Sequence, residues 1–116
     1  MKLCKPGEEL FRKHYDDLKE LAFFERLVKF AASGPVLAMV WEGDNVIVTG
    51  RKIIGATKEL DRNPGTLRAD QCLITSNNII HGSDSQDSAT AEINLWFKPE
   101  ELTAWGSHSN AWVYEK

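Results

Sequence analysis

One histidine, His81, stands where a short apolar run meets a series of small polar residues. Ile79 and Ile80 precede it, and Gly82 and residues 83–85 (Ser-Asp-Ser) lead into a helical pattern. Apolar residues that end at a glycine are typical of a short buried strand with a sharp exit. A histidine there is a largely neutral nucleophile at pH 7, able to accept a phosphoryl group and pass it on. Alternatively, His81 is only a hydrogen-bonding residue at a strand end.

Composition limits both the size and the partners of the protein. The chain has 116 residues and a formal net charge of −3 at pH 7, which predicts a single domain over residues 1–116 without a basic surface for nucleic acid. No apolar run approaches the roughly 20 residues that a membrane span needs, and the first residues lack a signal-peptide core. Cys4 and Cys72 have no metal-ligand spacing. We therefore expect free thiols and a cytoplasmic protein.

Hydrophobic spacing predicts four helices and three strands. Apolar residues recur every three or four positions in four segments, and we expect helices there: 8–19, 23–31, the segment after a cap at Asp44 with apolar residues between 46 and 54, and 86–97. Short apolar runs predict strands at 1–5, 36–41 and 79–82. The run at 36–41 is typical of a strand buried on both faces. Because such a strand needs two neighbours, this inventory indicates an incomplete sheet.

Two segments lack such a pattern. Residues 56–75 are polar and rich in turn formers, which predicts a long loop of the kind that is often functional or mobile. Trp105 and Trp112 lie in the tail, and large apolar side chains usually need a surface to pack on.

Residues 78–85, Asn-Ile-Ile-His-Gly-Ser-Asp-Ser, resemble the active-site signature of nucleoside diphosphate kinases. Six further segments resemble the same family in order and spacing: 14–19, 33–43, 49–51, 64–68, 95–102 and 112–115. The resemblance implies an α+β fold, a ferredoxin-like α/β sandwich with an antiparallel sheet. It also implies transfer of the γ-phosphate of a nucleoside triphosphate such as ATP to a nucleoside diphosphate, by a ping-pong reaction through a phosphohistidine on His81.

The resemblance implies a catalytic group around that histidine. Ser83 and Glu92 match a pair that orients it, and a glutamate within an otherwise apolar helix stripe suits such a role. Tyr15 matches a tyrosine beside the catalytic histidine, although a half-buried helix tyrosine is the simpler interpretation. His14 and His108 match no catalytic position, so we expect no role for them.

A second set of residues matches the family's nucleotide contacts. Two arginines match phosphate-binding forks, a threonine matches a donor to a phosphate oxygen, an aromatic and a leucine match the base slot, and an asparagine matches a ribose contact: Arg51, Arg68, Thr57, Phe23, Leu27 and Asn78. Without the resemblance, the arginines are ordinary surface residues, and the pair from 23–31 is helix core. Mg²⁺ would arrive with the nucleotide phosphates, because no carboxylate cage is evident, and we assign no metal ligand.

The sequence departs from the family at its start. Family members begin earlier, with a strand that ends in Lys-Pro-Asp-Gly and a following helix, whereas residues 1–4 match the middle of the second strand. We therefore expect an N-terminally truncated domain without the first strand, the first helix and that lysine. The resemblance implies a homo-oligomer, a hexamer, although Glu59 replaces a proline that supports subunit contacts. The alternative is a non-catalytic truncated homologue that acts as an assembly or interaction subunit or binds nucleotide.

Overall fold

The computed structural model describes residues 1–114, and its only regular sheet within them has two strands. Strands β1 (Lys2–Cys4) and β2 (Val36–Ala38) pair antiparallel, with Leu3 opposite Leu37. The predicted strand 36–41 is therefore too long, and the expectation that it is buried on both faces was wrong, because Leu37 is exposed. Within residues 1–114, β2 has a neighbouring strand on one edge only, so its other edge is unpaired.

Helices α1 (Glu8–His14) and α2 (Phe24–Ala31) form the core together with helix α5 (Gln86–Trp96). The buried side chains at its centre are Phe11, Phe24 and Val28, and Trp96 packs against them. The predicted helix 8–19 ends earlier, at His14, and a single 3₁₀ turn, η1 (Asp16–Leu18), follows. Two acidic residues occupy that turn, and acidic side chains oppose the negative end of the helix dipole.

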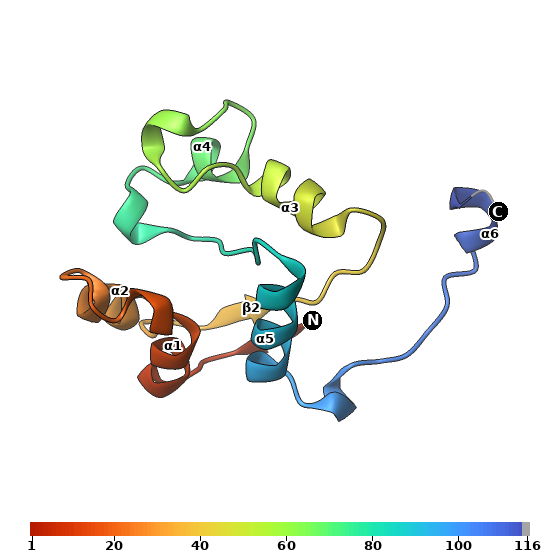
Figure 1. The fold of residues 1–116 in the computed structure, drawn as a ribbon, viewed down its shortest axis with the longest axis horizontal. Coiled ribbons are helices and arrows are strands. Elements are labelled where there is room, and N and C mark those ends of the chain that lie inside the picture. Colours follow the sequence, from red (N-terminus) through yellow and green to blue (C-terminus); the bar gives the residue numbers. More distant parts are fainter. Residues whose placement is uncertain (115–116) are drawn as a thin grey trace.

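A second group of short elements lies above α1, α2 and α5 in the view of Figure 1. It contains α3 (Val46–Ile54), η2 (Glu59–Asp61), α4 (Leu67–Gln71) and η3 (Thr75–Asn77). Asp44 does not cap α3, because the chain turns at Asn45, which takes the left-handed conformation with φ 52°.

The predicted long loop 56–75 is ordered by one arginine and two short helices. Arg62 donates to the carbonyl oxygens of Ala56, Thr57 and Cys72. These bonds tie both ends of the segment to its middle, which gives it a defined shape without a core of its own.

Residues 78–82 run extended between these two groups of elements (Figure 1) but form no strand. The predicted strand 79–82 was wrong because no other strand in residues 1–114 lies beside this segment to share a ladder. Arginine side chains serve its carbonyl groups instead. Arg68 Nη2 donates to Ile80 O at 2.9 Å, and Arg51 Nη1 donates to Gly82 O at 3.0 Å.

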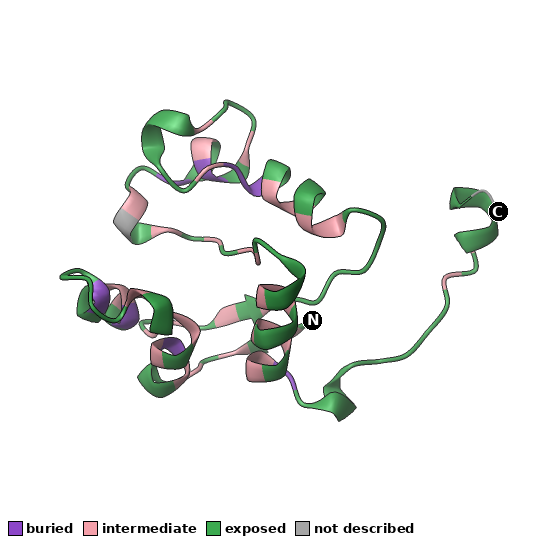
Figure 2. Ribbon diagram, viewed as in Figure 1, coloured by how far each residue is buried: buried purple, intermediate pink, exposed green. Residues whose placement is uncertain are grey.

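The chain ends in an arm that leaves the body after η4 (Pro99–Glu101) and carries α6 (Asn110–Val113) (Figures 1 and 2). Trp105 and Trp112 are both exposed there, so the expectation that they pack on a surface does not hold within residues 1–114. No helix in the same residues is both long and apolar enough to cross a membrane.

Candidate active site

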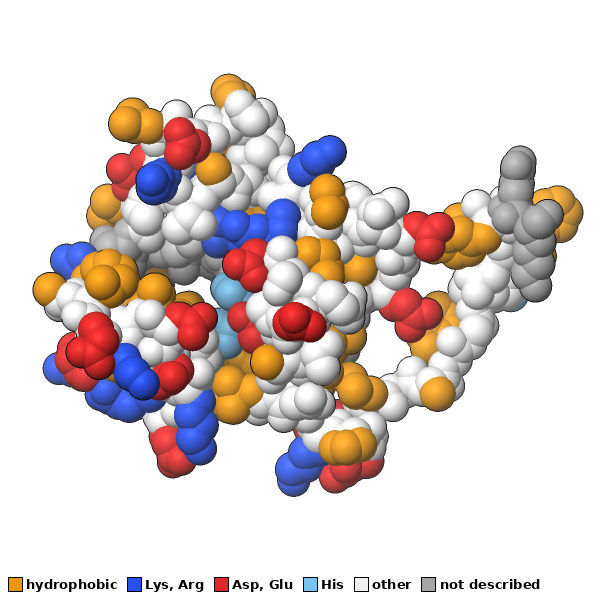
Figure 3. All heavy atoms as spheres, in the orientation of Figure 1, with side chains coloured by type: hydrophobic (Ala, Val, Ile, Leu, Met, Phe, Trp, Pro, Cys, Tyr) orange, Lys and Arg blue, Asp and Glu red, His pale blue; other side chains and the backbone are white. Residues whose placement is uncertain are grey.

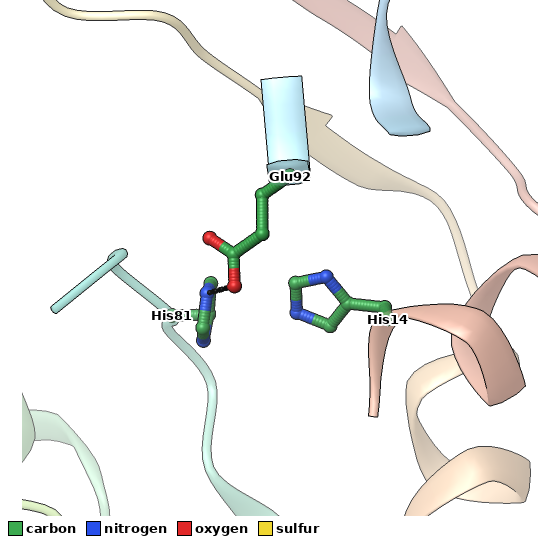
Figure 4. Close-up of side chains that lie close together, drawn as sticks. All are labelled: His14, His81 and Glu92. Carbon is green, nitrogen blue, oxygen red and sulfur yellow. Dashed lines mark hydrogen bonds and ion pairs between the residues drawn. The ribbon is translucent and has the colours of Figure 1, made fainter. Parts of the chain in front are cut away.

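His81 is held from one side by a carboxylate on α5. Its Nε2 lies 2.9 Å from Glu92 Oε1 (Figure 4). The hydroxyl of Ser83 donates to the other oxygen of the same carboxylate. An ionised carboxylate only accepts, so the hydrogen of this bond is on Nε2 of His81 and Nδ1 carries a lone pair. The side chain of His81 is 42% exposed. The arrangement therefore leaves a nucleophilic nitrogen on a side chain that is partly exposed to solvent.

The carboxylate of Glu92 is stabilised in its charged form. Burial acts to raise the pKa of Glu92, but the hydrogen bonds from Ser83 and His81 outweigh it and leave the pKa below 4.5. Glu92 therefore stays ionised at pH 7, as an acceptor for both neighbours.

Helix α5 begins in a way that brings Glu92 back to His81. Ser85 caps the helix, since its Oγ accepts from Ser88 N at 3.1 Å while Ser88 Oγ accepts from Ser85 N at 3.0 Å. Glu92 follows Ser85 by about two helical turns and so lies on the same face as the cap. Because the chain immediately before the cap carries His81 and Ser83, the carboxylate reaches both of them.

Aromatic side chains line the other side of His81. The ring of His14 lies 4.5 Å from that of His81 at 81°, and Tyr15 packs against His14 at 4.6 Å. Tyr15 is thus one ring away from His81, and burial raises the pKa of its hydroxyl. Burial and the nearby His81 lower the pKa of His14 to about 4, so His14 is neutral at pH 7.

Three of the expected nucleotide contacts meet at Arg68. This residue is only 2% exposed, and its guanidinium donates to Asn78 Oδ1 and to Thr57 Oγ1, each at 3.0 Å. It also donates to the carbonyl oxygens of Gly55 and Ile80. Burial lowers the pKa of Arg68. These four bonds use four of the five N–H donors of the guanidinium, so a phosphate oxygen would bind the remaining Nη2–H or replace one of these protein acceptors.

Arg51 lies on the neighbouring helix and is more accessible. It lines a shallow cavity of 410 Å³ together with Lys52 and Asp84. In Figure 3, Lys and Arg side chains form a cluster next to the exposed surface of the histidines. Gly82 lets Ile54 of α3 pack closely against the chain after His81, because a Cβ on residue 82 would lie 2.5 Å from Ile54 Cδ1.

Leu27 lies on α2 and Phe23 is the N-cap residue before it; this helix contacts η3 just before Asn78. Phe23 is 43% exposed, whereas its neighbour Phe24 is 8% exposed and belongs to the core. The interpretation of Phe23 as a core residue is therefore wrong. An exposed aromatic ring at the start of a helix remains available for a ligand.

Comparison with known proteins settles the family. Residues 1–102 match the family model described as nucleoside diphosphate kinase. The chain belongs to the nucleoside diphosphate kinase family. Nucleoside diphosphate kinase A of Canis lupus familiaris is 54% identical over 115 residues, which are 99% of this chain and 76% of that protein. Nucleoside diphosphate kinase B of Homo sapiens is 55% identical over the same shares.

Solved structures of the family confirm the fold class, α+β with a small antiparallel sheet. A halophilic nucleoside diphosphate kinase from Halobacterium salinarum, in complex with CDP, has a TM-score of 0.91 and 43% identity, covering 98% of this chain and 76% of its own. A family protein from Babesia bovis has a TM-score of 0.90 and 36% identity, covering 97% and 76%.

The sequence analysis missed two residues of this nucleoside diphosphate kinase site, His14 and Trp96. Trp96 Nε1 donates to His14 Nδ1 at 3.0 Å. One signal in the sequence pointed to Trp96, which follows Glu92 by four positions and so shares its helix face. His14 gave no such signal, because its partners are far away along the chain.

Proposed function

We propose that this chain is a nucleoside diphosphate kinase that carries the transferred phosphate on Nδ1 of His81. The observation that carries the proposal is the bond between His81 Nε2 and Glu92, which leaves the lone pair on Nδ1 of a partly exposed side chain. Relatives named nucleoside diphosphate kinase support it, because they align over 99% of this chain.

The chemistry follows from that bond. The lone pair on Nδ1 attacks the γ-phosphorus, the bond to the bridging oxygen breaks, and the nucleoside diphosphate leaves with the electron pair. The ring of His81 becomes positively charged while its Nε2 keeps its hydrogen, and the Glu92 carboxylate stabilises that charge. Ser83 holds the second carboxylate oxygen and prevents Glu92 from turning away. The reverse sequence delivers the phosphate to a second nucleoside diphosphate.

We assign the phosphates of the nucleotide to Arg51 and Arg68, with Thr57 beside them. A planar guanidinium makes paired bonds to phosphate oxygens, and each arginine can exchange one backbone carbonyl for such an oxygen. The relative in complex with CDP supports a nucleotide site on this fold.

We assign the nucleoside to Phe23 and Leu27 for the base and to Asn78 for the ribose. Stacking recognises the flat face of a base and not its edges, so purines and pyrimidines would both be accepted. The exposure of Phe23 and the contact between α2 and η3 support this assignment.

Mg²⁺ enters this proposal as a part of the nucleotide substrate. Magnesium prefers carboxylate and phosphate oxygens in octahedral geometry. The metal-ligand group that residues 1–114 bring together is His14, His81 and Glu92, which offers two imidazoles and one carboxylate that is already hydrogen-bonded. These residues do not suit Mg²⁺, which supports binding through the nucleotide phosphates.

We also propose that the chain forms a homo-oligomer, a hexamer as in the family resemblance, and works in the cytoplasm. Exposed large apolar side chains on β2, just after it and on the C-terminal arm support association: Leu37, Met39, Trp41, Trp105 and Trp112. The free thiols of Cys4 and Cys72 suit a reducing compartment. Light scattering would give the mass of the assembly, and a mass of one chain at micromolar concentration would reject the hexamer.

The intact mass of the protein tests the transfer. After incubation with ATP and Mg²⁺, the wild type should gain an acid-labile phosphate of about 80 Da and lose it when a nucleoside diphosphate is added. His81→Ala should gain nothing, whereas His108→Ala, which changes an exposed histidine on the arm, should behave like the wild type. A folded wild type without the adduct would reject the proposal and favour the non-catalytic interaction subunit.

A further inference from the structure

His14 lies between Trp96 and His81 and contacts both of them. The indole Nε1–H of Trp96 donates to His14 Nδ1 at 3.0 Å. An indole nitrogen only donates, so Nδ1 of His14 must carry the lone pair. In a neutral imidazole the single hydrogen is then on Nε2. Trp96 therefore selects one of the two tautomers of His14.

The position of His14 keeps its ring neutral. It is half-buried, and the titratable groups that face it are His81, Glu92 and Tyr15. Burial and His81 lower the pKa of His14 to about 4, against the opposite effect of Glu92. A neutral ring packs against His81 without adding a positive charge beside it.

The contact with His81 is an edge-to-face contact. The ring centroids are 4.5 Å apart, and the ring planes meet at 81°. Figure 4 shows His81 edge-on, with the ring of His14 directed at its face. The hydrogen bond from Nε2 to Glu92 fixes where that nitrogen points. A single hydrogen bond does not fix the tilt of the ring plane about the line of that bond. A second ring against the face removes that freedom.

The same three side chains could suggest a metal centre, because one ligand atom of each of His14, His81 and Glu92 lies within 4.8 Å of the others. The hydrogen bonds argue against it. Nε2 of His14 carries a hydrogen, and Nε2 of His81 donates to Glu92. A zinc ion would have to replace both hydrogens with bonds of about 2.0–2.1 Å to nitrogen. Support of His81 requires no such change.

We infer that His14 is a positioning residue, whose ring, oriented by Trp96, sets the plane in which His81 presents Nδ1 to the γ-phosphate. This inference rests on the proposed function. It predicts an effect on the rate of phosphate transfer and not on nucleotide affinity, because His14 acts through His81 and not on the nucleotide.

The test measures phosphohistidine formation in a single turnover at saturating ATP and Mg²⁺, together with the Kd of the nucleotide. His14→Ala removes the ring, and we expect the rate to fall about tenfold with an unchanged Kd, since misalignment of a reacting group costs up to about a hundredfold. His14→Phe restores a ring of similar shape but cannot accept from Trp96 Nε1, so its rate should recover only to that of Trp96→Phe. Trp96→Phe keeps both histidines but removes the donor, and should lower the rate about threefold by the same alignment argument.

A second measurement does not depend on catalysis. Long-range ¹H–¹⁵N spectra of the nucleotide-free protein should show His14 as the Nε2–H tautomer in the wild type and as a tautomer mixture in Trp96→Phe. If the wild type forms no phosphohistidine, the proposed function fails. The spectra still show whether Trp96 selects the Nε2–H tautomer of His14. A wild type that forms it, with His14→Ala equally fast or with only a changed Kd, would overturn the inference. If His14→Ala does not fold, unchanged rate and tautomer in Trp96→Phe would overturn it as well.

Discussion

Arg68 donates its Nε–H to Oδ1 of Asn78 at 3.0 Å. Arg68 is buried, with only 2% of its surface exposed. The two residues come from α4 and from the extended segment before His81, so this bond fixes the segment to the rest of the site. The other donors of Arg68 reach Gly55, Thr57 and Ile80. One guanidinium therefore holds together the parts of the chain that carry three of the proposed nucleotide contacts.

We expect Arg68→Lys to lower the free energy of unfolding by about 2–4 kcal/mol, because an ammonium group cannot reach acceptors on several sides and leaves buried ones unpaired. Urea unfolding followed by circular dichroism measures the change. Arg51→Lys is the matched control. Arg51 makes one hydrogen bond to a carbonyl oxygen, that of Gly82, so the free energy of unfolding should fall by only about 1 kcal/mol. Equal losses in both variants would contradict the buried network.

Phe23 and Phe24 are adjacent in the chain but should respond in opposite ways to truncation. Phe23→Ala removes an exposed ring and should weaken nucleotide binding about tenfold, as expected for one stacked base, with a stability change below about 0.5 kcal/mol. Phe24→Ala empties part of the core and should lower the free energy of unfolding by about 3–5 kcal/mol. Calorimetric titration with a nucleoside diphosphate and urea unfolding test the pair. An unchanged nucleotide affinity in Phe23→Ala would show that the base does not stack on Phe23.

The stability of the fold should decrease towards acid pH in two separate windows. His14 has a folded pKa of about 4 against 6.5 for the free group, so the unfolded chain binds the extra proton as the pH falls from about 6.5 to 4, and stability falls with it. Glu92 has a folded pKa below 4.5. Its contribution is complete above that value and is lost as the pH falls through the lowered pKa.

Glu92→Gln separates these windows. At pH 7 it should cost about 1–3 kcal/mol, because it removes the charge that accepts from His81 and Ser83. It should reduce the pH dependence of stability below pH 4.5 while leaving the decrease between pH 6.5 and 4, and His14→Phe should reduce the decrease between pH 6.5 and 4 instead. Urea unfolding at half-unit pH steps gives both curves. If the wild type loses stability in only one of these pH ranges, and only one of the two variants changes that loss, the group replaced in the other variant does not titrate as described.

Local patterns predicted α5, and the family resemblance implied the pairing of Ser83 and Glu92 with His81, whose side chains the structure brings together. The serines before the helix signal its start, and Glu92 falls on the face of the cap by spacing alone, so its meeting with His81 follows from residues 11 positions apart. The family and the fold class are confirmed. The catalytic roles of these residues stay predictions until the phosphohistidine is measured.

The errors concern features that depend on distant partners. Apolar runs at 36–41 and 79–82 indicate extended backbone, but a ladder also needs a neighbouring strand, which no local pattern reveals. His14 was passed over for a similar reason. Its hydrogen-bond partner Trp96 lies 82 residues along the chain, and only the packing of α1 against α5 brings them together.

The arginine bonds to Ile80 and Gly82 have one more consequence. These guanidinium groups occupy carbonyl oxygens that an added β-strand would use as acceptors, and in doing so they guard an open edge against sticking to other chains. A strand that paired with residues 79–82 would have to share Ile80 O and Gly82 O with the two arginines, since each carbonyl oxygen has two lone pairs.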